Sequence, residues 1–400
     1  MSERRLAILG AGPTGIEAAL AAADRGWSFE LFEASAAVGD NISDWGHVRL
    51  FTPWSLNVSP RMRRHLDRAG LPAPDDETCP TGSELRQRVL LPLAASPAMA
   101  PNLRLGARVV DISRTGLLKH EEIGTAERGR HAFRLLVRDS TGQEEIVTAD
   151  TVLDCTGSYS LTNWVGDGGI PAPGETAAAR RIFRRVPDLV ADADDWRGLA
   201  VLLIGAGYSA QTAVEGLARL AAEDGATKVV WALRSVTPQW QIDPQDPLPE
   251  RSRLTAAARE LAAGSSAAVD VRTGVVVERL AEVADGLEVT LRRVDGECET
   301  VTVDRLLGLT GSVGDHTMYR QLQVHECYAT CGPMKLAAAL LGAAGGDCLT
   351  QESHGAETLI NPEPGFFILG SKSYGRNATF LMRVGWQQVE EVFSLLEVAG

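Results

Sequence analysis

A β-α-β pattern with a glycine-rich turn occurs twice in this 400-residue sequence, and it limits the folds that the chain can adopt. Segments 5–35 and 199–235 each contain an apolar run of strand length, a turn rich in glycine, an alanine-rich helical stretch and a second apolar run. In both halves a later apolar run ends in Thr-Gly, at Thr156-Gly157 and at Thr310-Gly311. Strand, helix and strand in this order form a right-handed unit with parallel strands. We therefore predict an α/β fold built on two such units.

The first glycine-rich turn, residues 10–15, has the spacing G-x-G-x-x-G between a predicted strand and a predicted helix. Gly10 permits the tight turn, Gly12 lets a pyrophosphate approach the backbone, and Gly15 lets the helix pack closely on the sheet. The helix N-terminus then presents partial positive charge to the phosphates. Glu33 ends the next apolar run, where a carboxylate can bind a ribose diol. The turn is therefore predicted to bind a dinucleotide, and the alternative is a tight turn with a surface glutamate.

The second turn begins Gly205-Ala206-Gly207 and has alanine, Ala210, at the third glycine position, which the pattern allows. Its second strand ends in Arg234 and Ser235 instead of an acidic residue. Arginine can pair with a 2′-phosphate through charge-assisted hydrogen bonds, whereas a carboxylate would repel it. The second unit is therefore predicted to prefer NADPH. The alternative is a solvated arginine and NADH as the cofactor.

Composition excludes several other classes of protein. The net charge of −13 disfavours a general nucleic-acid or anionic-membrane surface. No apolar run approaches the roughly 18 to 20 residues of a membrane span, and the N-terminus has no apolar signal core. Six cysteines without a tight framework are typical of a reducing compartment. We expect a cytoplasmic protein without a nucleic-acid or membrane partner.

On these glycine turns and Thr-Gly ends, the chain resembles the two-dinucleotide-binding-domain flavoproteins. This group includes flavin-containing monooxygenases, N-hydroxylases and pyridine nucleotide-disulfide reductases. The resemblance implies FAD on the first unit, NADPH on the second, and two Rossmann-like domains with the NADPH domain inserted in the FAD domain. The FAD-binding domain would comprise residues 1–175 and 305–400, and the NADPH-binding domain residues 176–304.

The resemblance also implies which residues bind the cofactors. The backbone near Val110 would face the adenine, and Thr156, Gly157 and the C-terminal segment around Gly370 would lie along the flavin half. The residues predicted to bind FAD are Gly10, Gly12, Pro13, Thr14, Gly15, Glu33, Ala34, Asp40, Asn41, Trp45, Val110, Thr156, Gly157 and Gly370. The residues predicted to bind NADPH are Gly205, Gly207, Tyr208, Ser209, Ala210, Arg234 and Ser235.

Two residues are candidates for a catalytic role. His47 lies in an insertion, residues 40–100, that can form a lid beside the flavin, and histidine can move a proton near neutral pH. Lys372 stands near the position where many relatives carry an aspartate after the glycine, and there its charge would stabilise an anionic reduced flavin. The alternatives are a packed structural histidine and a surface lysine.

The cysteine positions bear on the reaction. Disulfide reductases need two cysteines close to the flavin, but residues 36–60 contain none and the NADPH domain contains only Cys298. Cys327 and Cys331 form the one close pair, at an unusual place, and we interpret them as structural. The resemblance then favours a monooxygenase that oxygenates N or S through a C4a-peroxyflavin. The Baeyer-Villiger signature is absent. The alternative is an NADPH-dependent reductase that passes electrons to a disulfide, quinone or partner.

The partners expected from this interpretation are a small-molecule substrate and O₂. No metal site is expected, because the spacing of the cysteine pair is poor for zinc and two further ligands are not apparent. Apolar helices near the C-terminus permit a homodimer.

Overall fold

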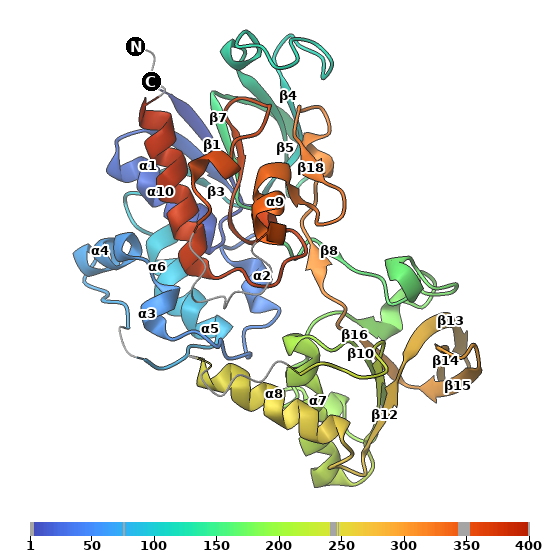
Figure 1. Ribbon diagram of the computed structural model, residues 1–400. Helices are drawn as coiled ribbons and strands as arrows, with labels where there is room; N and C mark the ends of the chain where they lie inside the picture. Colours follow the sequence, from blue (N-terminus) through green and yellow to red (C-terminus); the bar gives the residue numbers. More distant parts are fainter. Residues whose placement is uncertain (1–3, 75–76, 241–245, 247, 343–352, 399–400) are drawn as a thin grey trace. The chain divides into compact units, whose positions relative to one another are not determined.

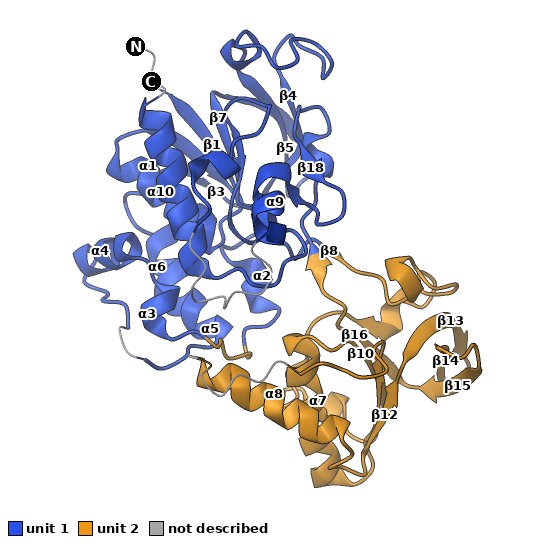
Figure 2. Ribbon diagram, viewed as in Figure 1, with its two compact units in different colours: residues 1–46, 52–161, 313–400 blue, residues 47–51, 162–312 orange. Residues whose placement is uncertain are grey.

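A computed structural model describes residues 4–74, 77–240, 246, 248–342 and 353–398 of the chain. These residues form two compact units, coloured separately in Figure 2. The first unit comprises Met1–Gly46, Thr52–Leu161 and Val313–Gly400, and the second comprises His47–Phe51 and Thr162–Ser312. The second unit thus interrupts the first in sequence, as predicted.

The second unit is longer than the predicted range 176–304. Residues 162–175 also belong to it, because Gly166 forms a parallel β-bridge with Val277 and the buried Glu175 carboxylate pairs with Arg184 at 2.6 Å. The first half of the chain also contributes the short segment 47–51 to this unit.

The core of the first unit is a five-stranded parallel sheet in the order β20-β7-β1-β2-β3. Its strands are β1 (Arg5–Leu9), β2 (Ser28–Phe32), β3 (Leu103–Arg104), β7 (Thr151–Asp154) and β20 (Phe366–Ile368). Apolar runs such as "LAIL" in β1 are buried, as expected for a sheet covered on both faces. Parallel pairing brings the carboxyl ends of β1, β7 and β20 to one edge.

Helices and a second sheet complete the first unit. The helices are α1 (Pro13–Asp24), α2 (Asp40–Ser43), α3 (Trp54–Asn57), α4 (Pro60–Arg68), α5 (Gly82–Leu85), α6 (Leu91–Ala94), α9 (Met334–Gly342) and α10 (Met382–Val398). Long helices α1 and α10 lie side by side (Figure 1), and Trp27, just after α1, stacks on Phe393 of α10 at 5.3 Å. The antiparallel sheet β4 (Ala107–Arg114), β5 (Phe133–Asp139) and β6 (Glu144–Ala149) shares a hydrophobic cluster with β1, β7 and β20.

The second unit repeats this plan. Its parallel sheet has the order β12-β11-β10-β16-β9. The strands are β9 (Ile182–Phe183), β10 (Ala200–Ile204), β11 (Lys228–Leu233), β12 (Val269–Thr273) and β16 (Arg305–Gly308). Helices α7 (Tyr208–Asp224) and α8 (Pro249–Ala262) follow β10 and β11 in sequence, and β13 (Val275–Val283), β14 (Gly286–Arg293) and β15 (Cys298–Val303) form an antiparallel sheet.

In both compact units, the first strand of the β-α-β segment is central in the sheet. It lies between the second strand of that segment and the strand that leads to Thr-Gly. Strand β1 lies between β2 and β7, and β10 lies between β11 and β16. Gly157 and Gly311 both have left-handed φ values, 74° and 85°. The predicted α/β fold, with two Rossmann-like domains of which one is inserted in the other, is confirmed. Two short strand pairs remain, β8 (Leu161–Thr162) with β17 (Ser312–Val313), and β18 (Glu326–Cys327) with β19 (Gly332–Pro333).

Candidate functional site

The first glycine-rich turn joins the carboxyl end of β1 to α1, and its three glycines have different surroundings. A Cβ atom at Gly10, where φ is +90°, would lie 2.8 Å from the Cys155 carbonyl oxygen, and one at Gly15 would overlap the Gly10 carbonyl oxygen. A Cβ atom at Gly12 would meet nothing within 4 Å. Gly12 is also the N-cap of α1 and makes no side-chain cap, and Pro13 follows it at the helix start. The helix N-terminus therefore faces open space over Gly12, which suits a phosphate.

Glu33 follows β2 and touches this turn directly. Its Oε2 accepts a hydrogen bond from the Ala11 backbone N–H at 2.8 Å, and its Oε1 accepts one from Ser35 N–H at 2.9 Å. Each carboxylate oxygen can accept a second hydrogen bond, so the group that fixes the turn can also bind ribose hydroxyls. Ala34, the next residue, is exposed.

Val110, predicted to face adenine, is at an irregular point of strand β4. The pairing of β4 with β5 shifts register between Val109 and Asp111, so Val110 is left out of the ladder. A bulged residue of this kind has backbone groups that do not bond to the neighbouring strand. This geometry is consistent with a backbone contact to an adenine, and the contact itself stays a prediction.

Lys372, one of the two predicted catalytic residues, is fully buried, which excludes the surface-lysine alternative. Its Nζ donates hydrogen bonds to Asp154 Oδ2 at 2.6 Å, Thr156 Oγ1 at 3.2 Å and the Asp315 carbonyl oxygen at 2.5 Å. An ammonium group has three N–H bonds, and these three acceptors use them all. Lys372 therefore anchors the loop after β20 to the end of β7, and the predicted stabilisation of an anionic reduced flavin by its charge stays a prediction.

The two glycines beside this ion pair both have left-handed φ values, and Gly370 is also constrained by packing. Gly370, with φ +72°, begins the 3-10 helix η9 (Gly370–Tyr374), and a Cβ atom there would lie 2.6 Å from the Thr14 hydroxyl of α1. A Cβ atom at Gly157 would lie 3.6 Å from Ser371 Oγ. The predicted residues Thr14, Thr156, Gly157 and Gly370 therefore meet at the carboxyl edge of the first sheet.

Beside Lys372 lies a polar cluster that the sequence analysis did not assemble. His316 Nδ1 and the Tyr319 hydroxyl both contact Glu326 Oε1, the latter at 2.7 Å. Burial alone would raise the pKa of Glu326, but the hydrogen bonds with His316 and Tyr319 outweigh it and lower that pKa. Burial, together with the charges of Asp154 and Glu326, raises the pKa of Tyr319 far above its usual range. Its three members lie within eleven consecutive residues, at the 3-10 turn Thr317–Tyr319 with its N-cap His316 and at the start of β18, but their spacing matches no known motif.

Trp45, Asp40 and Asn41 lie near the same turn. Asp40 and Asn41 begin the short helix α2, and both are exposed. The N–H of Gly39, just before them, donates to the Ala11 carbonyl oxygen at 3.1 Å. Trp45 stacks with Tyr159 at a ring separation of 6.3 Å. The indole N–H of Trp45 is buried and has no hydrogen-bond partner among the described residues, which leaves a donor for a bound molecule.

The second glycine-rich turn has the same geometry as the first. Gly205 has φ +132°, and a Cβ atom there would overlap the Leu309 carbonyl oxygen. A Cβ atom at Gly207, the N-cap of α7, would meet nothing within 4 Å. Tyr208 and Ser209 are exposed, whereas Ala210 is buried at the third glycine position. The open space over Gly207 therefore matches the open space over Gly12.

Arg234 and Ser235 follow β11 directly and are both exposed. Strand β11 is the parallel neighbour of β10, so Arg234 lies at the sheet edge that carries the glycine turn. Within the part of the chain that the structure describes, Arg234 forms no salt bridge. Its guanidinium is therefore available to a 2′-phosphate, and this contact stays a prediction.

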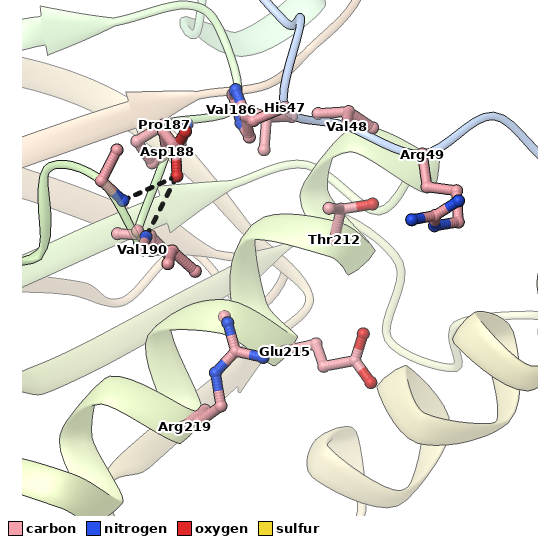
Figure 3. A pocket seen from close by; sticks show the side chains of 13 residues that line it. His47, Val48, Arg49, Val186, Pro187, Asp188, Val190, Thr212, Glu215 and Arg219 are labelled. Carbon is pink, nitrogen blue, oxygen red and sulfur yellow. Dashed lines mark hydrogen bonds between the residues drawn. The ribbon is translucent and has the colours of Figure 1, made fainter. Parts of the chain in front are cut away.

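His47, the other predicted catalytic residue, belongs to the second unit and is exposed. It lines a cavity of about 460 Å³ together with Asp188, residues 189–191 and one face of α7 that includes Glu215 (Figure 3). Asp188 accepts hydrogen bonds from the N–H groups of Val190 and Ala191, and these bonds, with the nearby His47, lower the pKa of Asp188. A position of His47 beside flavin stays a prediction.

Solved structures of two functional classes have the fold of this chain over its full length. The bacillithiol disulfide reductase Bdr (YpdA) from Staphylococcus aureus matches with a TM-score of 0.70 and 14% identity, covering 100% of this chain and 99% of that one. Thioredoxin reductase of T. acidophilum matches with a TM-score of 0.60 and 15% identity, covering 99% of this chain and 100% of that one. The ornithine N-hydroxylase KtzI of Kutzneria sp. 744, solved with reduced FAD, NADP⁺ and L-ornithine, matches with a TM-score of 0.62 and 14% identity, covering 99% of both chains.

No family model and no curated protein matches the sequence. The structural matches thus establish the fold that these reductases and hydroxylases share. No helix in the described part of the chain is long and apolar enough to cross a membrane. The described residues also contain no group of three or more His, Cys, Asp or Glu side chains placed to hold a metal ion.

Proposed function

We propose that this protein is an FAD-dependent oxidoreductase that uses NADPH, with FAD on the first unit and NADPH on the second. The observation that carries the proposal is the pair of matched glycine turns. In both, the first glycine has a left-handed φ and no room for a side chain, while the middle glycine leaves open space before a helix N-terminus. Two such turns in one chain fit two dinucleotides.

The residues present fit FAD along the edge of the first sheet. A pyrophosphate over Gly12 and a ribose at Glu33 place the adenosine half on the β2 side, toward Val110. The strand order β20-β7-β1-β2-β3 then leaves the β7 and β20 side for the flavin half, where Thr156 and Gly370 lie. The indole N–H of Trp45 is a free donor on this unit.

On the second unit, Gly207 and the start of α7 would bind the NADPH pyrophosphate, and Arg234 would bind the 2′-phosphate. When both cofactors are bound, they supply the transfer of a hydride from nicotinamide to flavin. The chain's own contribution is to hold the two nucleotides by backbone N–H groups and charge, and to select NADPH over NADH through Arg234.

Two classes of final electron acceptor are candidates. The first is O₂, with oxygenation of N or S in a small molecule. It is supported by the fold shared with the N-hydroxylase KtzI and by the absence of cysteine from residues 36–60. The second is a disulfide. It is supported by the fold shared with the disulfide reductase Bdr and by the placement of a cysteine pair described below.

Absorption spectroscopy of the purified protein tests the proposal. After incubation with FAD and removal of excess cofactor, the protein should be yellow and should bleach on anaerobic addition of NADPH. A protein that retains no FAD contradicts the proposal. Turnover in ¹⁸O₂ with amine or thioether substrates then distinguishes the two acceptors. A product labelled with ¹⁸O indicates oxygenation, whereas reduction of an added disulfide without a labelled product indicates a reductase.

A further inference from the structure

We propose that Cys327 and Cys331 form a redox-active dithiol that exchanges with a disulfide substrate. From the sequence alone, the unusual place of this pair favours a structural role. The hypothesis rests on the proposed function, because NADPH and FAD would supply the two electrons that return the pair to the dithiol state. It adds the site at which electrons leave the protein and the class of molecule that receives them.

The backbone places the two thiols within reach of each other. Cys327 ends β18 and pairs with Gly332 of β19, so Cys331 lies one residue before the partner of Cys327. Cys331 N–H donates to the Cys327 carbonyl oxygen at 2.8 Å, which closes a single turn. This i→i+4 hydrogen bond makes the segment an α-turn, with Cys331 at φ +57°, and it holds the two Cα atoms at the ends of the turn roughly 6 Å apart, near the range of about 4.4–6.8 Å that a disulfide requires. Both cysteines are free and half-buried.

The environment of Cys327 favours the reactive form of the thiol. The polar groups of Thr330 and Ala329, chiefly those of Thr330, lower the pKa of Cys327. Cys155 is the opposite case, because its full burial, together with the charge of Asp154, raises the pKa of its thiol well above the usual value. Cys327 is therefore the nucleophile in this proposal, and Cys331 is the resolving thiol.

The cysteine loop packs directly on the C-terminal motif of the first unit. Arg376 N–H donates to the Thr330 carbonyl oxygen at 2.7 Å. A Cβ atom at Gly332 would lie 2.9 Å from the Ser373 carbonyl oxygen, and one at Gly375 would lie 2.8 Å from Gly332 N. This motif follows β20, on the side of the sheet proposed for the flavin half of FAD. The loop therefore lies on that side of the first sheet, away from the adenosine half.

The loop is open to a partner. Tyr328, between the two cysteines, is 99% exposed, and Ala329 is exposed as well. Half-buried thiols on either side of an exposed loop tip can meet a disulfide carried by a small molecule or by a protein, and an exposed tyrosine is a frequent contact residue in interfaces. The chemistry recognised is the disulfide bond, and the two sources are separated by experiment.

The exchange balances as follows. The Cys327 thiolate attacks one sulfur of R–S–S–R, forms a mixed disulfide and releases R–S⁻. Cys331 loses its proton and attacks the Cys327 sulfur, which releases the second R–S⁻ and leaves a Cys327–Cys331 disulfide. The substrate gains two electrons and the pair loses two. NADPH then gives up one hydride, and together with one proton this restores both thiols.

Mass spectrometry of thiols tests the pair without any measurement of turnover. Trypsin releases residues 321–335 as one peptide that contains both cysteines. After treatment with oxidised glutathione, the wild-type peptide should contain an internal disulfide and no glutathione. The variant C331S should stop at a glutathione adduct on Cys327, and C327S should react far more slowly. The control C298S, at the exposed start of β15 in the second unit, should behave like wild type. A wild-type peptide that keeps glutathione, or that never forms the internal disulfide, overturns the proposal.

A reductive titration of the FAD-loaded protein then tests the link to flavin. With the pair oxidised, complete reduction of the wild type should take four electrons, and that of C327S two. Oxidised glutathione and insulin, offered in separate turnover assays, identify a small-molecule or a protein disulfide as the source. If FAD binds and bleaches but both proteins take two electrons, the dithiol proposal fails and the proposed function stands. If no FAD binds, the proposed function fails, and the peptide assay still reports on the thiols.

Discussion

Replacement of Lys372 by methionine should destabilise the first unit strongly. The ammonium and the Asp154 carboxylate are 2.6 Å apart, and both side chains are fully buried. Without Lys372, the buried Asp154 side chain loses its cationic partner, and the donors that remain to it among the described residues are the Thr156 backbone N–H and hydroxyl. Removal of one member of a buried ion pair costs about 3–5 kcal/mol. Since 1 kcal/mol shifts the melting temperature of a domain this large by about 2–4 °C, the melting temperature of the variant should fall by roughly 6–20 °C.

Differential scanning calorimetry of the variants measures this effect. Lys335→Met is the matched control, because Lys335 is exposed, and it should melt within about 2 °C of wild type, as a surface substitution should. The double variant Lys372→Met/Asp154→Leu should recover a large part of the loss, since no unpaired charge then stays buried. The reasoning is refuted if Lys372→Met melts like Lys335→Met, or if the double variant is less stable than Lys372→Met alone.

Three further predictions follow from the sites. Arg234→Ala should raise the KM for NADPH roughly 10- to 100-fold, the value of charge-assisted hydrogen bonds to a phosphate, and should leave the KM for NADH unchanged in steady-state kinetics. The control is Arg259→Ala, at an exposed residue of α8, and equal effects of Arg234→Ala on both coenzymes would remove the NADPH assignment. Gly15→Ala should yield little folded protein, because its Cβ would overlap the Gly10 carbonyl oxygen; a normal yield with wild-type circular dichroism would contradict the packing argument. Alkylation of Cys327 by iodoacetamide, followed by peptide mass spectrometry against pH, should have its midpoint below the ordinary thiol value, because the pKa of Cys327 is lowered and more thiolate is present near neutral pH; a midpoint at or above that value would count against Cys327 as the nucleophile.

Sequence spacing predicted the features that depend on neighbouring residues. The glycine turns, their flanking strands and the position of Glu33 follow from the order of residues along one β-α-β unit, because such a unit forms within a few dozen residues. The insertion of one unit in the other was implied by the resemblance to two-dinucleotide-binding-domain flavoproteins. These are the parts of the fold that the structure confirms.

Other features depend on contacts between distant segments. Lys372 and Asp154 are 218 residues apart, so the sequence showed a lysine at an unusual place and not the carboxylate that neutralises it. The bulge at Val110 depends on the register against β5. The segment 47–51 joins the second unit although the residues on both sides belong to the first. The sequence shows that the two cysteines are close along the chain. The packing of their loop on the segment after β20 depends on the tertiary fold and cannot be read from spacing.

The most direct test of the account places one aspartate in each glycine turn. Gly12 and Gly207 have ordinary extended backbone angles, and a Cβ atom at either would meet nothing within 4 Å. Both variants should therefore fold, with the new carboxylate in the space assigned to a phosphate. We predict that Gly12→Asp retains no FAD, whereas Gly207→Asp stays yellow, bleaches with dithionite and bleaches poorly with NADPH. Retention of FAD by Gly12→Asp, or loss of FAD from Gly207→Asp, would contradict the assignment of the two nucleotides.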